Sequence, residues 1–274
     1  MCALTRQCLQ GVTLLMDPKV PYGVTLAFTE RTGGFSEGVY TSLNLGDRCG
    51  DDVSTVTRNR KLVLEVLGAQ SYFSRLINPF QVHGDTVISL TSDTPEALQN
   101  AQQQARAGAD GIVCTVENTP VLLAFADCVP IILVAPGGFA VVHSGWKGTI
   151  ARIGARATRI LCDATHTRPY ELKAYIGPHI GPDDYEVSEE LMQRFVLEFG
   201  SNVVNTAMGS RYLDLGYAVR SALVEAGIKE ASIEEVTEST ASTTERFFSY
   251  RAEGGHCGRH AAVAYMNLSN NIQK

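Results

Sequence analysis

Three side chains that commonly bind transition metals occur at the ends of predicted strands: His83 in QVHG, Cys128 in ADCVPI and His143 in HSGW. A thiolate with two imidazoles can form a catalytic zinc site that keeps one coordination position open. The separations along the chain are 45 residues (128 − 83) and 15 residues (143 − 128), which is not the spacing of a zinc finger. We therefore expect a folded sheet, rather than one local loop, to assemble the site.

Other interpretations of these residues stay open. Cys128 as a nucleophile with His143 as its base would make a cysteine hydrolase. A metal that only braces the sheet would make a non-catalytic interaction protein. A strand-end cysteine is also often a simple core thiol, and a strand-end histidine often only hydrogen-bonds. Asp127 could orient a ligand or accept a proton, and it could equally be a turn residue before Pro130.

Glycine-rich segments suggest where an anion or a planar ring could bind. SGWKGT joins a strand to a helix N-terminus, where free amides attract anions, but it lacks the GxxxxGK[ST] order of a P-loop. Trp146, the only tryptophan, could stack on a ring or anchor the core. Arg31 and Arg251 each lie near a Gly-Gly pair, which suits a bidentate oxyanion contact, although many such arginines are simply on the surface.

A second cluster, HCGRH, places His256, Cys257 and His260 within five residues. The cluster lacks a matching second half elsewhere, and we rank it below the first trio as a metal site. His166 and His179 have no ligand-like neighbours in the sequence.

The composition is that of a globular protein: 274 residues, 45% hydrophobic and 19% charged. A net charge of −6 gives no basic footprint for nucleic acid. We expect no membrane span, since no apolar run approaches ~20 residues, and no signal peptide. Seven cysteines without a CxxC pair indicate reduced thiols and a cytoplasmic location. No oligomeric state is predicted.

Hydrophobic periodicity and turn residues predict the elements that must position the site. Alternating strands and helices indicate an α/β or α+β fold, with one domain over residues 1–274 and a mixed β-sheet core flanked by helices. The expected strands are 22–29, 77–83, 86–90, 109–114, 121–126, 131–135, 139–143, 233–237 and 261–265, with a further strand and loop over 172–181. The expected helices are 53–67, one starting near 149, one capped by Ser188 and one capped by Asp214, while 95–107 could be a helix or a mobile excursion.

Several motifs together resemble one protein family. QVHG, ADCVPI, HSGWKG, IGPHIGPDDYEV and FFSYR followed by GR occur in the order found in the multicopper-polyphenol-oxidase-like family, also called the laccase-domain or purine nucleoside phosphorylase family. The N-terminal block ERTGGFSEGVYTSLNLGDRCGDD resembles that family too. The similarity runs from about residue 24 to 266.

The resemblance implies a single mixed α/β domain, a zinc site formed by His83, Cys128 and His143, and a cytoplasmic enzyme. It implies phosphorolysis of adenosine, inosine and methylthioadenosine, together with adenosine deamination. In that reaction we expect Arg31, Arg251 and Lys147 to hold phosphate, and Asp127 to manage a proton. Copper is less favoured than zinc, because copper oxidases need several histidine-rich centres and this chain has six histidines.

The chain departs from the family pattern at three places. HSGWKG replaces the usual HAGWRG, so Lys147 keeps a charge but lacks the fork of arginine. Phe125 stands where threonine is frequent, and Cys257 stands where threonine usually precedes GR. These departures bear on the substrate range more than on the metal.

Overall fold

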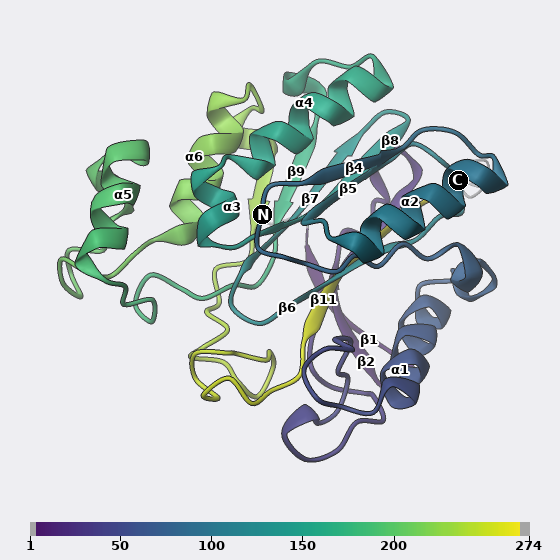
Figure 1. Ribbon diagram of the computed structural model, residues 1–274, viewed down its shortest axis with the longest axis horizontal. Coiled ribbons are helices and arrows are strands. Elements are labelled where there is room, and N and C mark those ends of the chain that lie inside the picture. Colours follow the sequence, from purple (N-terminus) through teal and green to yellow (C-terminus); the bar gives the residue numbers. More distant parts are fainter. Residues whose placement is uncertain (1–3, 269–274) are drawn as a thin grey trace.

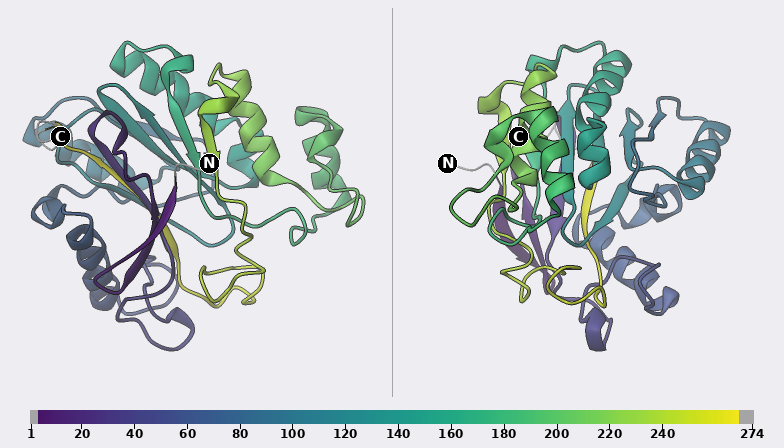
Figure 2. Two further views of the ribbon diagram at one scale, coloured as in Figure 1. Left: turned by 180° about the vertical axis from the view of Figure 1, so that it is seen from behind. Right: turned by 60° about the vertical axis from the view of Figure 1, so that its left-hand side comes forward.

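The computed structural model describes residues 4–268 and consists of two stacked β-sheets with helices on their outer faces (Figure 1). Cys2 lies outside the described residues. The five-stranded sheet is antiparallel throughout and has the order β1 (Thr5–Leu9), β2 (Val12–Met16), β3 (Val24–Thr29), β11 (His260–Met266) and β6 (Val121–Phe125). Figure 2 shows this sheet from behind, with the purple N-terminal strands leading to β3, which pairs with the yellow strand β11.

The six-stranded sheet is mixed. Its order is β10 (Ile233–Glu235), β9 (Lys173–Ile176), β7 (Val129–Ala135), β8 (Gly138–Ser144), β5 (Gly111–Cys114) and β4 (Val87–Leu90). The two outermost pairs, β10 with β9 and β4 with β5, are parallel, and the inner pairs are antiparallel. The mixed α/β class expected from the sequence is confirmed, but its strands form two sheets instead of one.

Helices cover the outer face of each sheet. On one side lies α1 (Val53–Val66), and on the other lie α3 (Trp146–Ile150), α4 (Ile153–Thr165), α5 (Glu189–Phe199) and α6 (Leu215–Glu225). The segment 95–107, for which the sequence left two options, is the helix α2 (Pro95–Ala107), which packs beside β4. None of the helices in the described part of the chain is long and apolar enough to cross a membrane.

Strand β7 shows why its sequence is apolar without interruption. Ile131 and Leu133 point into the apolar layer under α4 and α6, while Ile132 and Val134 point into the layer between the two sheets. Successive side chains of a strand alternate between faces, so a strand covered on both sides needs an apolar residue at every position. This buried strand holds Cys128, the residue just before it, in a fixed place.

Two elements differ from the expectation. Residues 77–83, predicted as a strand, form a loop, because Pro79 has no amide to donate and side-chain amides replace a β-ladder. Asn78 Nδ2 donates to Leu122 O at 2.7 Å, and Gln81 bonds both the amide and the carbonyl of Ala124 at 2.8 and 2.7 Å. The N-terminal hairpin β1–β2 was not expected, because outward-facing β1 carries mostly exposed, polar residues.

His260 begins β11 and is fully buried. Neither of its ring nitrogens has a hydrogen-bond partner in the described structure, and its ring packs against those of Phe125 and Phe247. Burial lowers the pKa of His260 to about 3, so the ring is neutral in the folded protein. It is therefore packed as an apolar residue.

We expect His260 to make the protein less stable in mild acid. Its pKa is lower in the folded than in the unfolded chain, so the unfolded state gains a proton as pH falls below about 6.5. This group then lowers the free energy of unfolding by about 1.4 kcal/mol per pH unit, down to pH near 3. Denaturant titrations from pH 7 to 4.5 should show that the free energy of unfolding falls less steeply with pH for His260→Leu than for the wild type. The control His256→Leu changes an exposed histidine, and parallel curves for all three proteins would contradict the prediction.

Candidate metal centre

The fold brings His83, Cys128 and His143 together. One nitrogen from each histidine and the Cys128 Sγ all lie within 4.8 Å of one another. His143 is in β8 and pairs with Pro130 of β7, so Cys128 lies just beyond the paired residues, while His83 comes from the loop before β4. The two imidazoles meet edge to face with ring centroids 4.8 Å apart. His143 is buried, Cys128 is half-buried and His83 is exposed, so the trio opens outward on the His83 side.

Gly145, the residue before α3, allows this close approach. A Cβ at Gly145 would lie 3.1 Å from Cys128 Sγ and 3.3 Å from His83 Cδ2. Its φ of −76° suits any residue, so glycine is required here for space and not for backbone conformation. The glycine of HSGW is thus part of the wall of the candidate metal centre.

Asp110 is a site residue that the sequence reasoning missed. Its fully buried carboxylate contacts His143 Nδ1 at 2.7 Å and accepts from the backbone amides of His83 at 2.9 Å and Gly84 at 2.7 Å. A carboxylate behind a ligating histidine fixes the tautomer and the ring orientation. With Nδ1 engaged, Nε2 is the His143 nitrogen left for a metal.

The charges of the trio pair a thiolate with a protonated imidazole, whose proton a metal would have to displace. Burial opposes ionisation of the Cys128 thiol, but His143 and His83 outweigh it and lower the pKa of Cys128 to about 6. Burial also opposes charge on His143, but Cys128 and Asp110 raise its pKa to about 9. Burial raises the pKa of Asp110, but His143 and the two loop amides outweigh this effect, and the pKa is lowered. Near neutral pH the thiol is therefore ionised, which is the form that binds metals.

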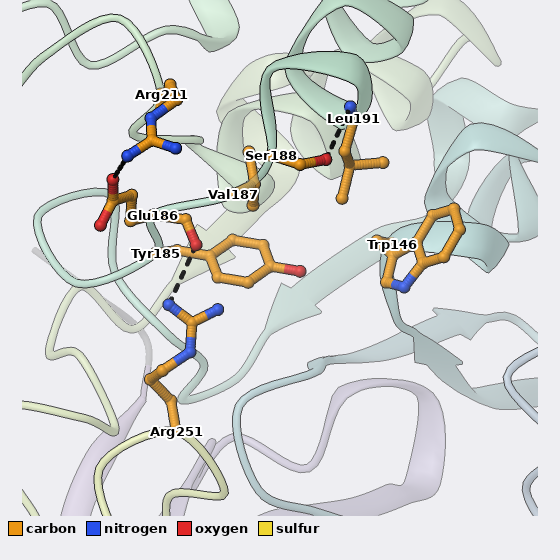
Figure 3. A pocket seen from close by; sticks show the side chains of 8 residues that line it. All are labelled: Trp146, Tyr185, Glu186, Val187, Ser188, Leu191, Arg211 and Arg251. Carbon is orange, nitrogen blue, oxygen red and sulfur yellow. Dashed lines mark hydrogen bonds and ion pairs between the residues drawn. The ribbon is translucent and has the colours of Figure 1, made fainter.

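The trio lies in the wall of a cavity of about 640 Å³. Beside it is a second pocket of about 400 Å³ that shares Trp146, Tyr185 and Arg251 with the first (Figure 3). In Figure 3 the Tyr185 hydroxyl points toward Trp146, and Arg251 donates to Glu186 O at 3.0 Å. Trp146 also packs against the apolar layer under α4 and α6, so it combines a core contact with a cavity wall.

Asp127 lines the cavity, but both of its carboxylate oxygens are engaged. One accepts from the Thr240 hydroxyl and the other from the Arg251 backbone amide, each at 2.7 Å. Its φ of 86° lies in the left-handed region, where aspartate is more readily tolerated than most residues. Asp127 therefore holds the 240–251 segment against the cavity.

Arg31 and Lys147 do not line this cavity. The Arg31 guanidinium donates to Thr41 O, Thr244 O and Glu253 Oε1 at 2.7–3.0 Å and lies over the Phe248 ring, so it joins two loops. Lys147 is exposed, with its Nζ 5.4 Å from the Trp146 ring centroid. Neither side chain therefore contributes to the cavity wall, and their expected role in holding phosphate stays a prediction.

The HCGRH cluster does not assemble as a metal site. His256 is exposed, whereas Cys257 and His260 are buried. Within residues 4–268, the trio of His83, Cys128 and His143 is the one group of three or more potential ligands close enough to share an ion.

Comparison with known proteins identifies the family of this chain. The family model described as multi-copper polyphenol oxidoreductase laccase matches residues 25–267. A purine nucleoside phosphorylase of Deinococcus radiodurans is 34% identical over 92% of both chains. Adenosine deaminase RL5, from an unknown prokaryotic organism, is 33% identical over 86% of this chain and 92% of its own.

A solved structure supports the same relationship. YlmD from Geobacillus stearothermophilus superposes with a TM-score of 0.84 and 29% identity, over 97% of this chain and all of its own. The chain therefore belongs to the multi-copper polyphenol oxidoreductase laccase family, whose relatives include proteins named purine nucleoside phosphorylase and adenosine deaminase.

Proposed function

We propose that the protein is a zinc-dependent purine nucleoside phosphorylase acting on adenosine, inosine and methylthioadenosine, with adenosine deamination as a second activity. The observation that carries the proposal is the His-Cys-His trio in the wall of a cavity large enough for a small molecule. The names of two relatives support the nucleoside class. We also propose a cytoplasmic location, supported by the six free cysteines of the described chain.

The residues present fit a zinc ion. His83, the ionised Cys128 and His143 would supply three ligands, a set typical of catalytic zinc with a fourth position free. When bound, zinc would polarise a substrate oxygen or lower the pKa of a water molecule to about 7. Copper remains the less favoured metal, because a multi-copper oxidase needs several centres and residues 4–268 offer this one group.

The surrounding side chains would bind and orient the nucleoside. Trp146 and Tyr185 offer aromatic faces on which a purine can stack. Arg251 reaches the cavity from the segment that Asp127 holds, and its guanidinium can contact substrate oxygens. A proton-transfer role for Asp127 stays a prediction, since its oxygens already accept two hydrogen bonds.

Two rival functions would use the same residues. Without metal, a Cys128 thiolate beside a protonated His143 has the form of a cysteine hydrolase pair. A non-catalytic zinc brace would use the same three ligands. The trio lies in a cavity wall, which favours a catalytic site over a zinc that only braces the sheet. His83 adds a third potential ligand, which favours a metal site over a Cys128–His143 hydrolase pair.

Turnover by the zinc-loaded protein tests the proposal. Adenosine or inosine with inorganic phosphate should yield the free base and ribose 1-phosphate, and adenosine alone should release ammonia. A chelator should abolish both activities and added zinc should restore them. Hydrolysis that persists in chelator and is stopped by iodoacetamide would support the cysteine hydrolase. Unfolding on metal removal, with no turnover before or after, would support the brace.

A further inference from the structure

The cavity beside the trio is positively charged although the chain carries a net charge of −6. Four arginines line it, Arg48, Arg60, Arg251 and Arg259, against two aspartates, Asp47 and Asp127. A concave site lined by an excess of one charge concentrates ligands of the opposite charge. The cavity is therefore suited to a ligand that carries negative charge.

The four arginines differ in how many of their donors are already used. Arg60 donates twice to Leu45 O and once to Asp47. Arg259 uses Nη1 for the carbonyls of Cys257 and Gly258, and Arg251 uses Nη1 for Glu186 O. Within residues 4–268, the Arg48 guanidinium has no hydrogen bond or ion pair, and its contact is with the Phe80 ring.

The stacking on Phe80 orients Arg48 without using its donors. The Arg48 Cζ lies 3.7 Å from the ring centroid of Phe80. In such an arrangement the attraction acts on the face of the guanidinium, and the N–H groups in its plane remain able to bind an oxyanion. A fixed fork loses less entropy on binding than a freely rotating lysine would.

The loop that carries Arg48 is held close to Arg259. Leu45 N donates to Arg259 O at 2.9 Å, and Arg259 N donates to Asn44 Oδ1 at 2.8 Å. A Cβ on Gly46 would lie 2.6 Å from Arg259 Cγ, so the Arg259 side chain runs directly across the loop. Two cavity arginines are thus supported by one compact segment, and Arg259 keeps Nε and Nη2 for a ligand.

We propose that Arg48, together with the free edge of Arg259, binds the inorganic phosphate co-substrate. The inference rests on the proposed phosphorylase activity. In that reaction a phosphate oxygen bonds to C1′ of the ribose while the C1′–N9 bond breaks. The electron pair of the C1′–N9 bond leaves with the base. The proton of hydrogen phosphate is transferred to the base, so hydrogen phosphate and nucleoside give ribose 1-phosphate and free base.

The test uses zinc-loaded protein and the variants Arg48→Ala, Arg48→Lys and Arg58→Ala. Arg58 is a matched control, because its Cζ lies 3.5 Å from the Phe35 ring centroid and it does not line the cavity. Arg48→Ala should raise the KM for phosphate by about tenfold or more, with Arg48→Lys between it and the wild type. Adenosine deamination, which uses no phosphate, should stay within about threefold. Arg58→Ala should match the wild type in both assays.

Calorimetric titration separates this inference from the proposed activity. Inorganic phosphate should bind the wild type and Arg58→Ala, and bind Arg48→Ala at least about tenfold more weakly. Equal phosphate affinity in all three proteins, or none in the wild type, would overturn the phosphate assignment whether or not nucleosides turn over. If Arg48→Ala weakened adenosine 5′-monophosphate but not inorganic phosphate, Arg48 would instead recognise a phosphate on the nucleoside. Absence of all nucleoside turnover, with phosphate binding retained and dependent on Arg48, would refute the proposed function alone.

Discussion

Cys128→Ser is expected to remove both the metal and the activity. A serine hydroxyl stays protonated near neutral pH, whereas the pKa of the Cys128 thiol is lowered to about 6 and the thiol ionises. Loss of the one anionic ligand leaves two imidazoles, one of them exposed, to hold the ion. We expect bound zinc to fall from about one ion per chain to a small fraction, and kcat to fall by about 10³ or more.

Metal analysis and turnover must be measured on the same samples. The control is Cys8→Ser, which changes an exposed thiol on β1, away from the cavity, and should keep both zinc and activity. A Cys128→Ser protein that lost activity but kept stoichiometric zinc would point to a nucleophilic thiol. One that kept both would remove Cys128 from the site altogether.

Asp110→Asn is expected to weaken zinc binding by about 10- to 100-fold. Asparagine has nearly the same shape, but one end of its side chain is a donor. If the asparagine NH2 group faced the amides of Val82 and Gly84, it would meet two other donors. If the NH2 group faced His143, Nδ1 would have to accept, and the proton of the neutral imidazole would then lie on Nε2, the nitrogen needed by the metal. Either orientation disrupts the site without changing a ligand.

Competition with a chromophoric chelator measures this zinc affinity, and thermal unfolding with and without zinc separates affinity from folding. Asp93→Asn serves as the control, because Asp93 is an exposed carboxylate paired with Arg75 at the surface. We expect the zinc-induced rise in Tm to shrink in Asp110→Asn and to be unchanged in Asp93→Asn. An unchanged zinc affinity in Asp110→Asn would show that the carboxylate does not orient the ligand.

The sequence was most informative where a residue type is uncommon and its chemistry is narrow. Two histidines and a cysteine at strand ends suggested a metal, and the fold brings them within 4.8 Å. The helix N-caps were also predicted from the sequence. The Ser188 side chain accepts a hydrogen bond from Leu191 N, and the Asp214 side chain accepts one from Tyr217 N. For the caps the structure shows the predicted hydrogen bonds, and for the trio it shows that the three side chains meet, while the metal stays a prediction.

Contacts between residues that are far apart in the sequence could not be predicted in this way. Asp110 precedes the short apolar strand β5, and nothing local shows that its partner is 33 residues away. Arg31 does make the multidentate contacts that its glycine-rich setting suggested, but with the chain's own carbonyls and Glu253. The division into two sheets likewise depends on which strands pair, which periodicity within a strand does not specify.

The 78–84 loop is attached through side chains, so the two parts of the candidate metal centre are held differently. Cys128 and His143 are anchored by paired core strands, whereas the side chains of Gln81 and Asp110 hold the residues around His83. Loop segments of this kind open at lower free energy than core strands do. Opening of this loop would withdraw His83 while the strands that hold Cys128 and His143 stay paired, and Asp110, which bonds both His143 and the loop amides, would oppose that opening.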